Sequence, residues 1–297
     1  MPVQLDSILD IAEQFEAVVL DQWGVLHDGT NPYPDAIETL QALRSRGLRL
    51  AVLSNSGKRA EPNLARIASM GFDGDLFETV MTSGETLWQS FEHDRLTSAG
   101  LMTANRLFAI ERSAGDAKNW AHGLDLAFVS TLVDAEAILL MGLPDGPDAA
   151  AYDDLFEKAL QQQLPVYCSN PDRASPRADG VQVISPGELA HRYADRGGNV
   201  TFYGKPFGPV FRAVERSLDL PADKLLMVGD SLAHDILGGA DAGWSTLFIR
   251  GGLYRAHFSD ADANNGSGDK HAIEVTLRRL AKSQNSPLPN YMMRFLK

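Results

Sequence analysis

The stretch at 17–25, AVVLDQWGV, decides the fold. Four apolar residues end at an aspartate and a polar turn, a pattern typical of a buried strand in a parallel sheet. A second apolar run, LRLAVL at 48–53, ends at Ser54 in the same way. Between the two runs, apolar residues recur at helical spacing, and Gly47 stands where a helix would end. The sequence therefore predicts a βαβ unit.

The same alternation of strand and helix patterns continues along the chain. Further apolar runs of strand length lie at 106–110, 137–142, 165–170, 199–204, 225–230 and 245–249. They predict an α/β protein with a Rossmann-like parallel-sheet core. We expect this core to comprise residues 1–82 and 201–297, with a second α/β domain at 83–200 inserted into it. We expect the tail from Gln284 to be loosely held.

Composition narrows the classes of protein. A chain of 297 residues is long enough for two domains. The formal net charge of -12 argues against nucleic acid or a membrane surface as a partner. Acids near the start, and the lack of a basic region followed by an apolar block, predict that there is no signal peptide and that the protein is cytoplasmic. Cys168 is the only cysteine, so no intramolecular disulfide can form.

Polar residues terminate several of the apolar runs, and ligands of open parallel sheets bind at the carboxyl ends of strands. Asp21 ends one run, and Asp230 ends another in VGDSLAHD, which also contains Asp235. Three carboxylates gathered there would form a hard oxygen site suited to Mg²⁺. The alternative for Asp21, and for Asp230 or its neighbour Ser231, is an ordinary helix N-cap.

Two further strand ends carry groups suited to a phosphate. Ser54 is followed by Asn55 and Ser56, so a hydroxyl and turn amides are available for a phosphoryl oxygen. Lys205 follows the run at 199–204 and supplies a positive charge. The alternative for Ser54 is an ordinary helix cap, and for Lys205 a solvated surface charge.

The order and spacing of these groups resemble a known family. DQWGV, VLSNS, YGKP and GDSLAHD look like the four motifs of the haloacid dehalogenase superfamily. LSNSGKR, TSGET, AILLMGLPDG, YCSNPDR and LLMVGDSLAHDILGGADAGW are similar to its NagD-like subgroup, IIA. The resemblance spans about residues 17–253. It implies an α/β cap domain of the C2 type, inserted between the second and third motifs.

The resemblance also implies roles. Asp21 would attack phosphorus and form an aspartyl-phosphate. Ser54 would bind the phosphoryl group and Lys205 would neutralise its charge. Asp230 would ligate Mg²⁺ together with Asp21, and Asp235 would be a second or water-mediated partner.

Two other positions follow from the same resemblance. The backbone carbonyl of Trp23 would complete the protein ligands of the metal. Asn170 and Asp172 match the cap loop that contacts substrate in NagD-like proteins. For Asp172 the alternative is a solvent-exposed turn.

Trp23 departs from the family's pattern. Phosphatases of the superfamily place a second aspartate there to protonate the leaving oxygen. A positioned acid is worth about 10² to 10⁴ in rate, so alkoxide leaving groups should depart slowly from this site. His27 and Asp28 are candidates to supply the proton, and the alternative is a hydrogen-bonded turn with Asp28-Gly29 as its corner.

Together these features predict a hydrolase, specifically a Mg²⁺-dependent phosphatase of a small phosphorylated metabolite such as a sugar phosphate or nucleotide-like compound. A homodimer is compatible with the sequence. One alternative is a catalytically impaired regulatory protein that binds phosphate and metal. A second alternative is a carbon-group hydrolase of dehalogenase type, which the metal aspartates and the NagD-like cap argue against.

Overall fold

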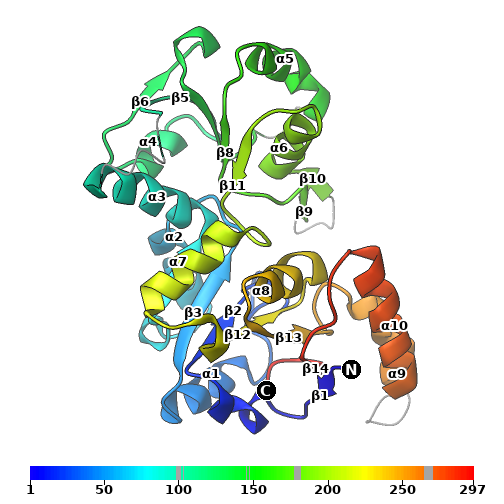
Figure 1. The fold of residues 1–297 in the computed structure, drawn as a ribbon. Coiled ribbons are helices and arrows are strands. Elements are labelled where there is room, and N and C mark those ends of the chain that lie inside the picture. The colour runs from blue at the N-terminus through cyan, green and yellow to red at the C-terminus, as the bar shows by residue number, and fades with distance from the viewer. Residues whose placement is uncertain (98–101, 103, 145, 147, 177–181, 264–269) are drawn as a thin grey trace. The chain divides into compact units, whose positions relative to one another are not determined.

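The computed structural model describes residues 1–97, 102, 104–144, 146, 148–176, 182–263 and 270–297. The chain forms two compact units, each made of segments that are not continuous in sequence (Figure 1). Unit 1 comprises Met1–Ser54, Leu64–Met81 and Phe211–Lys297. Unit 2 comprises Asn55–Asn63 and Thr82–Val210.

Unit 1 is built on a seven-stranded sheet. Its order is β1 (Val3–Gln4), β14 (Tyr291–Met293), β13 (Ser245–Ile249), β12 (Leu225–Gly229), β2 (Ala17–Leu20), β3 (Arg49–Ser54) and β4 (Thr79–Thr82). The pairings from β1 through to β3 are all parallel. Every residue of the central strands β2 and β12 is buried, which explains their unbroken apolar sequences.

Helices connect these strands. They are α1 (Ala36–Ser45), α2 (Ala60–Ser69), α7 (Gly208–Leu218), a π-helix (Leu232–Ile236), α8 (Leu237–Asp241), α9 (Arg255–Ala263) and α10 (Lys270–Ser283). Short 3₁₀ turns lie at Ile8–Asp10, Ala12–Gln14, Gly74–Leu76 and Ala222–Lys224. After α1, Gly47 adopts a φ of +87°, the left-handed conformation that ends a helix. Figure 1 shows α9 and α10 packed side by side.

Unit 2 contains a second parallel sheet, of five strands. Its order is β11 (Val200–Phe202), β8 (Val166–Cys168), β7 (Ala137–Leu140), β5 (Arg106–Ile110) and β6 (Ala127–Val129). An antiparallel pair, β9 (Ala174–Pro176) and β10 (Gln182–Ile184), is separate. The helices are α3 (Ser83–Thr97), α4 (Asp116–Trp120), α5 (Asp153–Gln161) and α6 (Pro186–Asp195), with 3₁₀ turns at Leu132–Asp134 and Ala149–Tyr152. Figure 1 shows α6 beside β8 and β11.

Both faces of this five-stranded sheet are buried. Along β7, Ile138 and Leu140 belong to one apolar cluster, whereas Ala137 and Leu139 belong to another. The alternation follows from the two-residue period of a strand. Cys168 lies in the first cluster and is fully buried, and burial raises the pKa of its thiol to about 12.

The α/β fold with parallel sheets confirms the predicted Rossmann-like class. The expectation of a loosely held tail was wrong, because Tyr291–Met293 forms β14 and pairs with both β1 and β13. The boundaries of the two units differ from those expected for the two domains. Val200–Phe202 pairs with β8 and therefore belongs to the second sheet. Unit 2 extends to Val210, and it also takes in Asn55–Asn63. Among the described residues, no helix is long and apolar enough to cross a membrane.

Candidate active site

Three neighbouring strands of unit 1 end in the residues expected to carry chemistry. Strand β2 lies between β3 and β12, and all three run parallel. Asp21 directly follows β2, Ser54 is the last residue of β3, and Asp230 directly follows β12. The main-chain N–H of Asp21 donates to the carbonyl of Val228 at 2.9 Å, which continues the ladder to the end of the strand. Parallel pairing therefore brings these polar groups to one edge of the sheet.

Three carboxylates converge at this edge. Asp21, Asp230 and Asp235 each present one oxygen, and these oxygens lie within 4.8 Å of one another. Asp230 and Asp235 are buried, and Asp21 is partly exposed. Asp235 comes from the π-helix that follows β12. Burying acids so close together is costly unless a cation neutralises them.

Glycines form a cradle around the two buried carboxylates. A Cβ atom on Gly24 would lie 1.7 Å from Oδ2 of Asp230, and one on Gly252 would lie 2.2 Å from the same oxygen. A Cβ on Gly229 would lie 2.2 Å from Cβ of Asp235. Gly24 also has a φ of +73°, which disfavours other residues. The space for the carboxylates therefore exists only because these three positions lack side chains.

Main-chain amides orient both buried acids. The N–H of Leu253 donates to Oδ2 of Asp230 at 2.7 Å, and the N–H of Ser231 donates to Oδ2 of Asp235 at 3.0 Å. The three carboxylates of the cluster supply hard oxygen donors of the kind that Mg²⁺ prefers, so the residues fit a divalent cation.

Trp23 lies in the turn after β2. The residue is 46% exposed. Its main chain forms an isolated β-bridge with the main chain of His27. The His27 ring is fully buried, and its Nδ1 accepts a hydrogen bond from the N–H of Gly29 at 3.0 Å. Burial, and then the positive charge of Arg66, lower the pKa of His27. A neutral imidazole is a weak proton donor, so this environment favours a structural role for His27.

The side chain of Asp28 is hydrogen-bonded within the same turn. Its Oδ1 accepts hydrogen bonds from the N–H groups of Thr30 and Asn31, at 2.9 and 2.7 Å. These bonds lower the pKa of the Asp28 carboxyl, which is the wrong direction for an acid catalyst. The suggestion that His27 or Asp28 replaces the missing acid stays a prediction.

The remaining predicted site residues lie in unit 2, where Asn55 connects two of them. Its Nδ2 donates to Oδ1 of Asp172 at 2.7 Å and to the carbonyl of Lys205 at 3.1 Å. Its Oδ1 accepts from the main-chain N–H of Lys205 at 2.7 Å. Gly204 makes this approach feasible, because a Cβ there would lie 2.6 Å from Oδ1 of Asn55. Asn55 thus fixes the backbone that carries the buried Lys205.

Asn170 and Ser56 have local partners in the same unit. Oδ1 of Asn170 accepts from the N–H of Asp172 at 3.0 Å, and this bond shapes the predicted cap loop. The Ser56 hydroxyl accepts from the main-chain N–H of Lys58 and from Nδ2 of Asn63, both at 3.3 Å. The polar atoms of this segment are therefore held in a defined arrangement.

The predicted site residues thus form two groups. Unit 1 holds Asp21, Trp23, Ser54, Asp230 and Asp235, and unit 2 holds Asn55, Ser56, Asn170, Asp172 and Lys205. Sequence reasoning missed the glycine cradle and the Leu253 amide. Gly24 stands three residues after Asp21 in DQWGV, so its place in the motif was the available signal.

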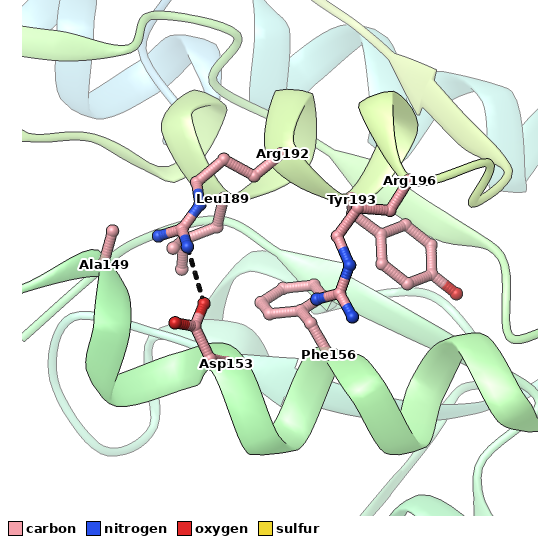
Figure 2. A pocket seen from close by; sticks show the side chains of 7 residues that line it. All are labelled: Ala149, Asp153, Phe156, Leu189, Arg192, Tyr193 and Arg196. Carbon is pink, nitrogen blue, oxygen red and sulfur yellow. Dashed lines mark hydrogen bonds and ion pairs between the residues drawn. The ribbon is translucent and has the colours of Figure 1, made fainter.

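A shallow depression on unit 2 does not suit a metabolite. It lies between α5 and α6, and Figure 2 shows its lining by Ala149, Asp153, Phe156, Leu189, Arg192, Tyr193 and Arg196. Its volume of about 10 Å³ is that of a single water. Arg192 is paired with Asp153 at 2.7 Å, and Arg196 is paired with Glu157, so both cations are already neutralised.

Comparisons with known proteins agree with this geometry. Residues 18–110 match the family model described as haloacid dehalogenase-like hydrolase, and residues 202–273 match one described as HAD-hydrolase-like. Chronophin of Homo sapiens is 26% identical over 283 residues, covering 89% of this chain and 90% of that protein.

Two solved structures share the fold. A haloacid dehalogenase-like hydrolase from Brucella suis 1330 is 26% identical, with a TM-score of 0.73, and covers 85% of this chain and 95% of its own. A glycerol phosphate phosphatase from Mycobacterium tuberculosis in complex with magnesium is 23% identical, with a TM-score of 0.63. The match covers 86% of this chain and 73% of that chain.

Proposed function

The chain belongs to the haloacid dehalogenase superfamily, and we propose that it is a Mg²⁺-dependent phosphatase. Its substrate would be a small phosphorylated metabolite. One observation carries the proposal: the oxygens of Asp21, Asp230 and Asp235 lie within 4.8 Å of one another, at the end of the central strands.

Asp21 is the proposed nucleophile. It is the member of the cluster that is partly exposed, so it is the one that an incoming phosphate reaches. One of its oxygens bonds to phosphorus while the bond from phosphorus to the leaving oxygen breaks, and water later hydrolyses the aspartyl-phosphate. When bound, Mg²⁺ supplies positive charge that offsets the charge of the phosphate and the carboxylates.

The other groups would hold the transferring phosphoryl group. Ser54 offers a hydroxyl at the end of β3, next to the strand that carries Asp21. We assign Lys205 to charge neutralisation and Asn55 and Ser56 to the phosphate-binding segment. Asn170 and Asp172 are the proposed substrate contacts of the cap loop.

The decisive assay measures phosphate release from 4-nitrophenyl phosphate with and without Mg²⁺. We expect activity that excess chelator removes and that Asp21→Asn lowers by roughly 10³-fold or more. Asp6→Asn, at an exposed position outside the site, is the matched control and should retain wild-type activity. The hydrolase proposal fails if a broad panel of phosphate esters gives no Mg²⁺-dependent release.

A second candidate function is phosphate binding without turnover. It is favoured by the environment of the turn after β2, where Trp23 has no acid group that could protonate a leaving oxygen and the pKa values of His27 and Asp28 are both lowered. Calorimetry would then detect Mg²⁺-dependent binding of inorganic phosphate to a protein that hydrolyses no ester. Rapid turnover of any phosphate ester would exclude this candidate.

A further inference from the structure

The indole of Trp23 is exposed in a way that needs explanation. The exposed large apolar side chains of the described chain are Met1, Val3, Trp23, Leu96, Val133, Leu253 and Val275, and Trp23 is the one aromatic residue among them. The other three tryptophans are not in this group. An exposed aromatic residue that stands two positions after a carboxylate of the candidate site marks a surface that a ligand could cover.

This exposed ring is held in place by three residues. The His27 ring packs against it in a T-shaped arrangement, with a centroid distance of 5.7 Å and an interplanar angle of 72°. The guanidinium of Arg66 lies 5.4 Å from its centroid and also donates to the carbonyl of Gly29 at 3.1 Å. Gly29, with a φ of +101°, lies so close that a Cβ would be 2.2 Å from Cη2 of the indole. The ring is therefore preorganised, which lowers the entropic cost of stacking on it.

The position of the ring relates it to the leaving group. Trp23 stands two residues after the proposed nucleophile, where family phosphatases carry the acid that meets the leaving oxygen. Gly24, the next residue, lies against the carboxylate of Asp230. Leu253, whose N–H donates to that same carboxylate, is 64% exposed. Two apolar side chains thus come from segments that touch the metal-binding acid.

We propose that Trp23 determines specificity by stacking on the leaving group, and that the substrates are phosphate esters of planar aromatic or heteroaromatic hydroxyl compounds. This inference rests on the proposed phosphatase function. Two requirements coincide in such esters. Without an acid at position 23, the leaving oxygen must be a stable anion, and phenols are far more acidic than alkyl alcohols. An indole surface in turn favours a planar ring.

The step balances without a protein acid. A bond forms between an Asp21 oxygen and phosphorus, and the bond between phosphorus and the aryl oxygen breaks. The electron pair remains on the aryl oxygen, where the ring delocalises it, and the phenolate then takes its proton from solvent. Trp23 contributes contact with the ring and takes no part in proton transfer.

Two substrates separate stacking from leaving-group acidity. 4-Nitrophenyl phosphate and acetyl phosphate both release stable anions, but only the first contains a ring. For Trp23→Leu we expect kcat/KM for 4-nitrophenyl phosphate to fall about three- to tenfold, and kcat/KM for acetyl phosphate to change less than about twofold. Trp23→Phe should retain most activity toward both. Val275→Ala, at an exposed apolar position on α10, should behave as wild type.

A binding measurement tests the same contact without turnover. Competitive inhibition by 4-nitrophenol should weaken about three- to tenfold in Trp23→Leu. Thermal unfolding of this variant checks that the fold is retained.

Equal losses on both substrates, or unchanged inhibition by 4-nitrophenol, would overturn the stacking role. If the wild-type protein hydrolyses neither ester in Mg²⁺, the proposed phosphatase function itself is contradicted. Failure of the stacking role and failure of the phosphatase function are therefore distinguishable.

Discussion

The Asn55 side chain and the Lys205 main chain hydrogen-bond to each other in both directions. The N–H of Lys205 donates to Oδ1 of Asn55 at 2.7 Å, and Nδ2 of Asn55 donates to the carbonyl of Lys205 at 3.1 Å. The two residues are 150 positions apart in sequence. The Asn55 side chain therefore binds the N–H and the carbonyl of Lys205 as a neighbouring strand would, and it fixes the position of the Lys205 main chain.

Asn55→Ala should consequently lower kcat/KM for 4-nitrophenyl phosphate by roughly ten- to a hundredfold, because it removes both bonds to Lys205 and the bond to Asp172. Asn55→Asp keeps the acceptor for the Lys205 N–H but loses the donors and adds a charge beside Asp172, so it should also be impaired. Asn119→Ala, at an exposed position on α4, is the control. Wild-type kcat/KM in Asn55→Ala would contradict this positioning role.

The glycine cradle predicts a pair of matched variants. Gly24→Ala would place a Cβ 1.7 Å from Oδ2 of Asp230, so we expect loss of Mg²⁺ binding, measured by calorimetry. Gly47 also has a positive φ, but a Cβ added there would meet nothing within 4 Å. Gly47→Ala should therefore destabilise the protein by about 1 kcal/mol and leave Mg²⁺ affinity unchanged. Equal Mg²⁺ affinities in the two variants would show that the cradle is unimportant.

Restoring an acid at position 23 should change the reaction selectively. Trp23→Asp places a carboxyl group where family phosphatases have one, so it should hydrolyse an alkyl phosphate about 10² times faster than Trp23→Asn, which has the same size but no acid. The gain on 4-nitrophenyl phosphate should be smaller, because its leaving group needs no proton. Similar gains on both esters would mean that proton transfer does not limit the rate.

His191 predicts a dependence of stability on pH. Its ring stacks on Phe202 at 4.5 Å, and burial, followed by the charge of Arg173, lowers its pKa below the ordinary 6.5. The unfolded chain therefore binds a proton that the folded chain resists, so stability is present above about pH 6.5 and decreases as the pH falls below it. His191→Phe keeps a ring and removes the titration. Its urea midpoint should fall less than that of wild type between pH 7 and 5, and identical slopes would contradict the assignment.

Much of the fold could be predicted because the central strands carry unbroken apolar runs. Ala17–Leu20, Arg106–Ile110 and Ser245–Ile249 were predicted at their observed bounds. The strand at Tyr291–Met293 was missed because it is three residues long and owes its conformation to pairing with β1 and β13. No local pattern reveals such a tertiary pairing.

For the site, too, residues marked by a local sequence pattern could be predicted, whereas contacts between distant residues could not. Asp21 and Asp230 could be predicted because each directly follows a recognisable strand, and Asp235 because it lies in the same VGDSLAHD motif as Asp230; their carboxylates do converge. The bonds of Asn55 to residues 117 and 150 positions away depend on tertiary folding, and nothing in the neighbouring sequence announces them.

The single thiol of the chain has a practical consequence. Cys168 is enclosed in the core of the five-stranded sheet and remains protonated well above neutral pH, so maleimide dyes should leave the native protein unlabelled. Any cysteine introduced on the surface would then be the only site to react. Two introduced cysteines, one in each unit, could carry a pair of fluorophores without prior removal of the natural cysteine. The distance between the two fluorophores could then be followed during turnover.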